Sequence, residues 1–189
     1  IVRAVTKSGF EHRQLPYYTY AWLREWFLSS RGVGRNNITE SHVGPCMNQH
    51  TAPSEMTHLP YDGEYSKKRL SEELQDVLED WYGGPLTMTS IYGIRRYTNN
   101  SILRMHVDTV FTHVVSAIIN VDQKVDRDWK LKILDHDYNE HEMVMKPGDL
   151  VLYESAKLLH GRPDTFSGEH YDNIFIHYAP VESGKGTGV

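Results

Sequence analysis

The chain has 189 residues, and 39% of them are hydrophobic, which fits a single domain with a sizeable core. Its formal net charge of −5 argues against nucleic acid and anionic membrane surfaces as partners, and no apolar run approaches the roughly 20 residues that a membrane span requires. A single cysteine, Cys46, excludes an internal disulfide framework.

The N-terminal third is expected to be helical and irregular. Residues 17–30 (YYTYAWLREWFLSS) place large apolar side chains at helical spacing, which predicts a helix that ends before Gly32. We expect its apolar stripe in the core: Trp22, Leu23, Trp26 and Phe27. A second helix is predicted within residues 66–84, capped by Ser66 or Ser71 and ended by two glycines. Its apolar face consists of Leu70, Leu74, Val77, Leu78 and Trp81.

Residues 31–63 lie between the predicted helices and contain scattered Gly, Pro, Asn and His without a periodic pattern. Loops of this length are usually lids or binding segments, so we interpret this one as a lid over the functional site. Four of its residues are of types that bind zinc: His42, Cys46, His50 and His58. Their spacing matches no zinc motif, and Gly44-Pro45 breaks any helix that would align them, so a zinc site is not expected.

After residue 85, short β-branched and aromatic runs replace the helical patterns, and Gly, Pro, Asn or Asp bound each of them. The predicted strands are 86–98, 102–109, 112–122, 129–135, 141–145, 149–155 and 173–179. Residues 135–141 (DHDYNEH) and 146–149 (KPGD) are predicted turns. Many short strands without intervening helices indicate an antiparallel sandwich or jelly roll. The expected fold is α+β, one domain in which residues 1–84 supply helical support and the lid, and residues 85–180 form the jelly-roll core.

The stretch LRMHVDTVFTHVV raises the question of function. His106 and Asp108 are two residues apart, so a strand would direct both side chains to the same face. A jelly roll brings distant strands together, and His160 is expected to end a strand late in the order. Two histidines and one carboxylate on one side of a metal form the facial triad of non-haem Fe(II) oxygenases. The pattern predicts an iron site, and a metal-free sandwich with incidental polar residues is the simpler alternative.

The motifs from about residue 71 to residue 180 follow a family order: EELQ, RRYTNNSILRMHVD, SAIINVD, KPGDLVLY, LLHGRP and GEHYDNIFIHY. This order resembles the 2-oxoglutarate- and Fe(II)-dependent oxygenases of the prolyl 4-hydroxylase type. The resemblance implies a double-stranded β-helix core, iron on His106, Asp108 and His160, and Tyr97 in the co-substrate pocket. In the family, the N-terminal region and the loops between strands cover the active site and choose the substrate.

One position departs from the family pattern. The family places a Lys or Arg about ten residues after the distal histidine to bind the far carboxylate of 2-oxoglutarate, whereas this chain has His170 there. Three interpretations stay open. His170 holds the carboxylate, another cation such as Arg162 holds it, or the enzyme does not use 2-oxoglutarate.

The resemblance implies hydroxylation of an unactivated C–H bond, coupled to oxidative decarboxylation of 2-oxoglutarate to succinate and CO2, with O2 as oxidant and ascorbate as an optional reductant. Asp108 favours hydroxylation, because related halogenases lack a carboxylate at that position. The expected partner is a peptide, with a prolyl residue as one option, or a small molecule. His113 either faces this substrate or is a core histidine. A jelly roll that binds a peptide or sugar without turnover is the rival interpretation. The oligomeric state stays open, as does the compartment, cytosol or secretory-pathway lumen.

Overall fold

The structure is a computed structural model that describes residues 5–31, 37–40 and 52–181. The helices of this part are α1 (Tyr17–Ser30) and α2 (Lys67–Tyr82). Its strands are β1 (Phe10–Gln14), β2 (Asn37–Glu40), β3 (Ser54–His58), β4 (Leu86–Tyr97), β5 (Leu103–His106), β6 (Val115–Val125), β7 (Leu131–Leu134), β8 (Glu140–Met143), β9 (Asp149–Tyr153), β10 (His160–Arg162) and β11 (Gly168–Pro180). No helix of the described residues is long and apolar enough to cross a membrane.

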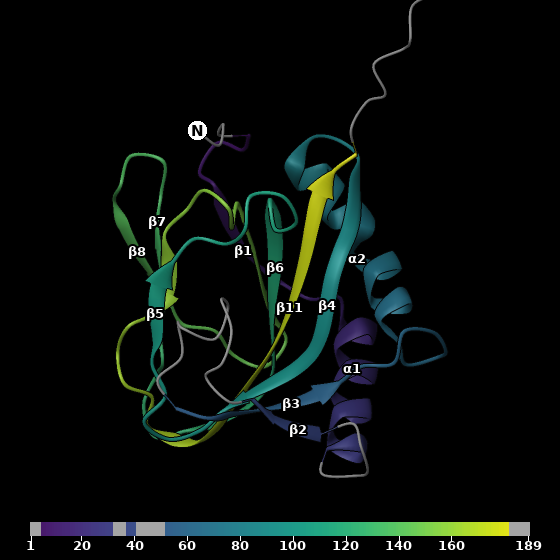
Figure 1. The fold of residues 1–189 in the computed structure, drawn as a ribbon, viewed down its shortest axis with the longest axis vertical. Helices are drawn as coiled ribbons and strands as arrows, with labels where there is room; N and C mark the ends of the chain where they lie inside the picture. The colour runs from purple at the N-terminus through teal and green to yellow at the C-terminus, as the bar shows by residue number, and fades with distance from the viewer. Residues whose placement is uncertain (1–4, 32–36, 41–51, 182–189) are drawn as a thin grey trace, which may run out of the picture.

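Two antiparallel sheets face each other across the interior, as Figure 1 shows. The major sheet has seven strands in the order β1-β9-β6-β11-β4-β3-β2, and the minor sheet has four in the order β5-β10-β7-β8. Strands that are far apart in sequence are neighbours in both sheets, as a jelly roll requires. Both helices lie against the outer face of the major sheet, where they share a hydrophobic core with it. The α+β jelly-roll prediction is confirmed.

The helices form where their periodicity and caps predict. In α2 the Ser66 hydroxyl accepts a hydrogen bond from the backbone N–H of Arg69 at 3.1 Å, so Ser66 is the cap and Ser71 is not. Gly83 ends the helix in the left-handed conformation with φ 81°. The aromatic stripe of α1 is buried against the sheet, as predicted, with Leu23 and Phe27 fully inaccessible.

Side chains along β6 point alternately into two hydrophobic cores, one between the major sheet and the helices and one between the two sheets. Ala117 and Ile119 face the helices, whereas Ile118 belongs to the core between the sheets. Ser116 shares the inward parity of Ile118 and lies opposite Tyr153 of β9. The middle of the major sheet therefore presents polar side chains to the interior at one level, and this level borders the candidate site.

The N-terminal third contains strands that the sequence analysis did not predict. β1 pairs with β9, and β2 and β3 extend the major sheet beyond β4, so the core is not confined to residues 85–180. The interpretation of 31–63 as one loop is wrong at 37–40 and 54–58. These short strands lack apolar alternation and form through main-chain pairing to an existing edge. Gly93 permits the contact, because a Cβ there would lie 2.2 Å from the Thr57 carbonyl oxygen.

Two further expectations for residues 31–63, the lid and the absence of a zinc site, concern residues that lie largely outside the described part of the chain. Residues 32–36 and 41–51, which include His42, Cys46 and His50, lie outside the described residues. His58 ends β3, and its Nδ1 donates to the backbone carbonyl of Tyr92 at 3.2 Å.

Candidate metal centre

The minor sheet places the two candidate histidine ligands side by side. His106 ends β5 and His160 begins β10, and the two residues are direct cross-strand partners. Their ring centroids lie 4.5 Å apart. Asp108 follows β5 in a turn that crosses towards the major sheet, where its backbone N–H donates to the carbonyl of Ser155 at 2.8 Å. His160 begins a short strand, whereas the sequence suggested that it ends one.

The three side chains converge on one point. The Nε2 atoms of His106 and His160 lie 3.6 and 4.0 Å from Oδ1 of Asp108. Nδ1 of His106 lies 2.7 Å from the Arg104 carbonyl oxygen, and Nδ1 of His160 lies 2.8 Å from the Leu158 carbonyl oxygen. A carbonyl only accepts, so each Nδ1 carries the ring proton. Both Nε2 lone pairs therefore face the carboxylate with no proton between them.

Burial keeps both imidazoles in the neutral form. It lowers the pKa of His160 to about 4 and lowers that of His106, with the neighbouring His160 acting in the same direction. Burial also raises the pKa of Asp108, which the adjacent histidines oppose. Three electron-pair donors that meet around one point match the donor set and the facial geometry of a divalent transition-metal site. The residues present fit iron.

A cavity of about 150 Å³ opens beside the triad. Engineered cavities of that size bind molecules such as benzene, so it has room for a small organic molecule. The residues that line it include all three predicted metal ligands and the predicted co-substrate residues Tyr97 and Arg162. His113, the predicted substrate residue, also lines it.

Two arginines line this cavity, and Arg95 is paired with Glu40, whereas Arg162 has no such partner among the described residues. Arg162 is 1% exposed, and its guanidinium lies over the rings of Tyr171 and Trp129, 4.6 and 5.1 Å from their centroids. Nη1 donates to the Trp129 carbonyl, and Nη2 lies 3.3 Å from Sδ of Met145. No carboxylate of the described residues lies within ion-pair distance of it. A buried charge without a counter-ion is costly, so this end of the cavity favours an anion.

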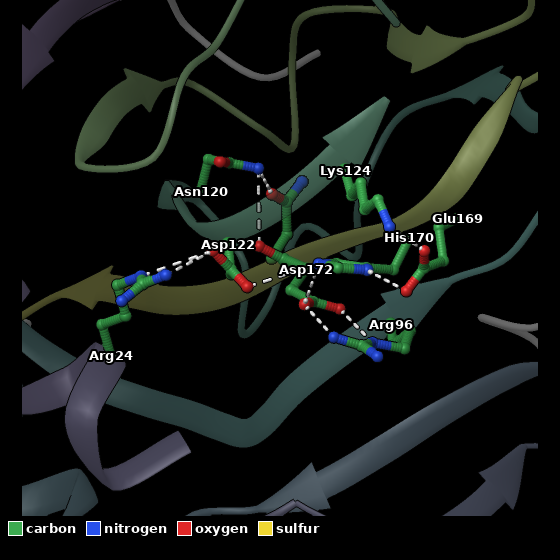
Figure 2. A network of polar contacts seen from close by, with 9 residues as sticks. Arg24, Arg96, Asn120, Asp122, Lys124, Glu169, His170 and Asp172 are labelled. Carbon is green, nitrogen blue, oxygen red and sulfur yellow. Dashed lines mark hydrogen bonds and ion pairs between the residues drawn. The ribbon is translucent and has the colours of Figure 1, made fainter. Parts of the chain in front are cut away.

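His170 belongs to a different group of polar residues, beside Asp122 and Asp172 (Figure 2). It is not among the residues that line the cavity, and its Nε2 lies 3.3 Å from Asp122 Oδ2 and 3.7 Å from Asp172 Oδ2. The pairing of β11 with β6 shifts register between Gly168 and His170. The next residue, Tyr171, faces Arg162 instead. The position of His170 does not support the prediction that it anchors the co-substrate.

The cluster around His170 also resembles a metal site in composition, since Asp122, His170 and Asp172 bring possible ligand atoms within 4.8 Å of one another. Two arginines already neutralise its carboxylates. Arg96 binds both oxygens of Asp172, at 2.7 and 2.6 Å, and Arg24 donates to Asp122 at 3.0 Å (Figure 2). A divalent cation there would face two guanidinium groups, so we interpret the cluster as an ion-pair network that joins α1, β4, β6 and β11.

Sequence analysis missed the polar residues behind the triad. His177 of β11 lines the cavity, with its ring 3.7 Å from that of His113 between centroids. Its Nδ1 lies 2.7 Å from Oγ of Ser116, which lies 2.6 Å from Oγ of Ser155. Strand alternation could have indicated Ser116, because it is a polar residue next to Ile118 on the inward face of β6. Nothing local marks His177 or Ser155.

No protein-family model matches the chain, and no curated protein matches its sequence. Solved structures do resemble it. A prolyl-4-hydroxylase from Pseudomonas putida is 12% identical over 93% of this chain and 94% of its own, with a TM-score of 0.65. An oxidoreductase of the 2OG-Fe(II) oxygenase family from Burkholderia pseudomallei is 14% identical over 90% of this chain and 85% of its own, with a TM-score of 0.66.

HygX from Streptomyces hygroscopicus, solved with nickel and 2-oxoglutarate bound, is 14% identical over 93% of this chain and 84% of its own, with a TM-score of 0.66. A further HygX structure also contains hygromycin B. At these identities the likeness shows the fold. The chain has the jelly-roll fold of the 2-oxoglutarate and Fe(II) oxygenases.

Proposed function

We propose that the protein is an Fe(II)- and 2-oxoglutarate-dependent oxygenase that hydroxylates an unactivated C–H bond. The observation that carries this proposal is the pair of Nε2 lone pairs that face Oδ1 of Asp108 at 3.6 and 4.0 Å with no proton between them. Such an arrangement is unfavourable unless a cation lies at its centre. The fold of the compared oxygenases supports iron as that cation.

Each metal ligand is oriented by the backbone. The carbonyls of Arg104 and Leu158 fix the tautomers of His106 and His160, so both present Nε2 to the metal. Asp108 presents Oδ1, and its backbone bond to Ser155 fixes the turn. Bound iron and 2-oxoglutarate would supply O2 activation coupled to decarboxylation, and the filled carboxylate position favours hydroxyl transfer over halide transfer.

Arg162 is the proposed anchor of the far carboxylate of 2-oxoglutarate. It lies two residues after His160, so strand alternation directs both side chains to the same interior. The guanidinium interacts electrostatically with the hydroxyl groups of Tyr97 and Tyr171. Burial raises the pKa of both phenols, so both hydroxyls stay protonated and can donate hydrogen bonds. A charged bond to an anion contributes roughly 1.5–3 kcal/mol. Arg162 therefore replaces the lysine or arginine that the family resemblance placed at position 170.

The substrate would enter on the side of the cavity lined by Tyr92, Val107, Thr109 and His113. Tyr92 and Val107 are each 49% exposed, so this rim offers apolar surface beside the metal ligands. A peptidyl residue, as the name of the Pseudomonas putida enzyme indicates for that protein, and a small molecule, as in the HygX complex, are the two candidate classes.

Anaerobic addition of Fe(II) and 2-oxoglutarate tests the proposal. The wild-type protein should develop a visible charge-transfer band, because the 2-oxo acid chelates the iron. Glutarate, which lacks the keto group, is the matched control and should give no band. Exposure to O2 should then convert 2-oxoglutarate to succinate. A folded wild-type protein that binds Fe(II) but gives no band would instead support the rival binding module or an iron oxygenase with another co-substrate.

A further inference from the structure

The hydrogen bonds behind Asp108 form a chain with a fixed direction. The Ser155 hydroxyl lies 2.7 Å from the backbone carbonyl of His113. A carbonyl only accepts, so the single proton of Ser155 points to it. Ser155 therefore cannot donate to Ser116.

The direction of the Ser155 proton fixes the next two hydrogen bonds. Ser116 and Ser155 share a hydrogen bond of 2.6 Å, and since Ser155 has no proton left for it, Ser116 donates. His177 Nδ1 lies 2.7 Å from Oγ of Ser116, whose proton is now also used. Nδ1 of His177 must then be the donor. The protons run in one direction, from His177 through Ser116 to Ser155.

A second contact supports the same tautomer. Nδ1 of His177 lies 3.9 Å from Oδ2 of Asp108, where an N–H is attracted to the carboxylate and a bare lone pair would be repelled. A neutral imidazole carries a single proton, and these contacts place it on Nδ1. Nε2 is left with its lone pair.

Nε2 is the remaining acceptor of the ring. His177 lines the cavity together with the three metal ligands, its side chain is 8% exposed, and no described residue hydrogen bonds to its Nε2. We propose that Nε2 of His177 is a fixed hydrogen-bond acceptor for the substrate, which must therefore carry a hydroxyl or amide N–H close to the C–H bond that is oxidised. This inference rests on the proposed function and narrows its substrate class.

The tautomer excludes some substrates as well. A carboxylate or an ether oxygen placed against Nε2 would face a lone pair, and leaving the acceptor buried and unpaired should weaken binding roughly tenfold to hundredfold. Among peptides, a residue whose neighbouring peptide N–H reaches the site fits. Among small molecules, polyols and amides fit better than acids.

The tautomer can be measured without knowing the substrate. Long-range 1H–15N correlation spectra of protein with 15N-labelled histidine, loaded with diamagnetic Zn(II) and 2-oxoglutarate, distinguish Nδ1–H from Nε2–H, and His177→Gln identifies the His177 signals. We expect the Nδ1–H form in the wild type and a mixture of tautomers in Ser116→Ala, which breaks the chain. An Nε2–H or doubly protonated His177 in the wild type would overturn the proposal, even if Ser116→Ala fails to fold.

A fragment titration then tests the substrate class. The fragments form matched sets: alcohols and secondary amides, their O-methyl and N-methyl counterparts, and the corresponding carboxylates. We expect only the alcohols and amides to shift the Nε2 resonance of His177. Equal shifts with the methylated counterparts, shifts with carboxylates alone, or no shift up to the solubility limit would each contradict it. Loss of the Fe(II)/2-oxoglutarate band would instead mark failure of the proposed function, so the two outcomes are separable.

Discussion

The triad of His106, Asp108 and His160 and the Asp122–His170–Asp172 cluster have similar compositions and opposite electrostatics. In the triad, backbone carbonyls hold the Nδ1 protons, so only lone pairs point inward. In the cluster, Nδ1 of His170 has no hydrogen-bond partner among the described residues, and Nε2–H can donate to Asp122.

The triad and the Asp122–His170–Asp172 cluster also differ in whether cationic side chains neutralise their carboxylates. Arg24 and Arg96 bind the carboxylates of the cluster, whereas no arginine or lysine of the described residues pairs with Asp108. The candidate metal centre differs from the ion-pair network in the direction in which each imidazole proton points and in the charge that remains unbalanced. Residue types and spacing alone would give both clusters equal weight.

Metal binding should separate the two clusters most strongly. Removing a directly coordinating imidazole, in His106→Ala or His160→Ala, should weaken Fe(II) or Mn(II) binding by more than about 100-fold, the upper range for loss of a supporting residue. His170→Ala and Asp122→Asn are the matched controls and should retain wild-type stoichiometry. Calorimetric titration measures the affinity, and circular dichroism checks folding. Normal metal stoichiometry in both triad variants would contradict the assignment.

Loss of Asp172 should instead affect folding. Its carboxylate is fully buried and forms a two-point ion pair with Arg96, so Asp172→Asn leaves a buried charge without its partner. We expect a loss of about 3–5 kcal/mol in the free energy of unfolding, measured by urea denaturation. The double change Arg96→Met with Asp172→Leu should recover much of this loss. If Asp172→Asn were as stable as the wild type and lost metal, the cluster would be the metal site.

The metal-free protein should lose stability in mild acid because of the triad. The pKa of His160 is about 4 when folded and near 6.5 when unfolded, so between these values the unfolded chain binds more protons and stability falls as pH falls. His160 should contribute on the order of 3 kcal/mol to this pH dependence of the free energy of unfolding. The stability is fully present above pH 6.5 and is lost towards pH 4. Denaturation in EDTA should give a shallower pH slope for His160→Gln than for the wild type. Identical slopes would show that His160 titrates normally.

The smallest effect is expected at the two candidate anchors of 2-oxoglutarate. Arg162→Met keeps the apolar packing and removes the charge, and it should weaken 2-oxoglutarate binding roughly tenfold to hundredfold with metal binding retained. Arg162→Lys should lie between Arg162→Met and the wild type. His170→Ala should bind like the wild type. Loss of affinity in His170→Ala with none in Arg162→Met would return the anchor to His170.

Local patterns in the sequence were sufficient for both helices, and together with the family resemblance they indicated the fold class and the candidate triad. Helical periodicity, the Ser66 cap and the two-residue spacing of His106 and Asp108 are short-range signals. β2 and β3 could not be predicted, because they form by pairing with an edge that only the folded sheet provides.

The choice between His170 and Arg162 depended on tertiary structure for a similar reason. The family position selected His170, but a register shift in β11 turns its side chain towards Asp122. A single-residue shift reverses which side chains face the interior, and no local pattern predicts it. The proposed acceptor tautomer of His177 depends on β6, β11 and the turn after β9 together, so no local pattern of the sequence indicates it.

A crystal structure with Mn(II) and 2-oxoglutarate, grown without oxygen, tests the central claim most directly. The account predicts an anomalous peak between the Nε2 atoms of His106 and His160 and a carboxylate oxygen of Asp108, with the far carboxylate of 2-oxoglutarate on Arg162. A metal peak at Asp122, His170 and Asp172, or a far carboxylate bound away from Arg162, would contradict it.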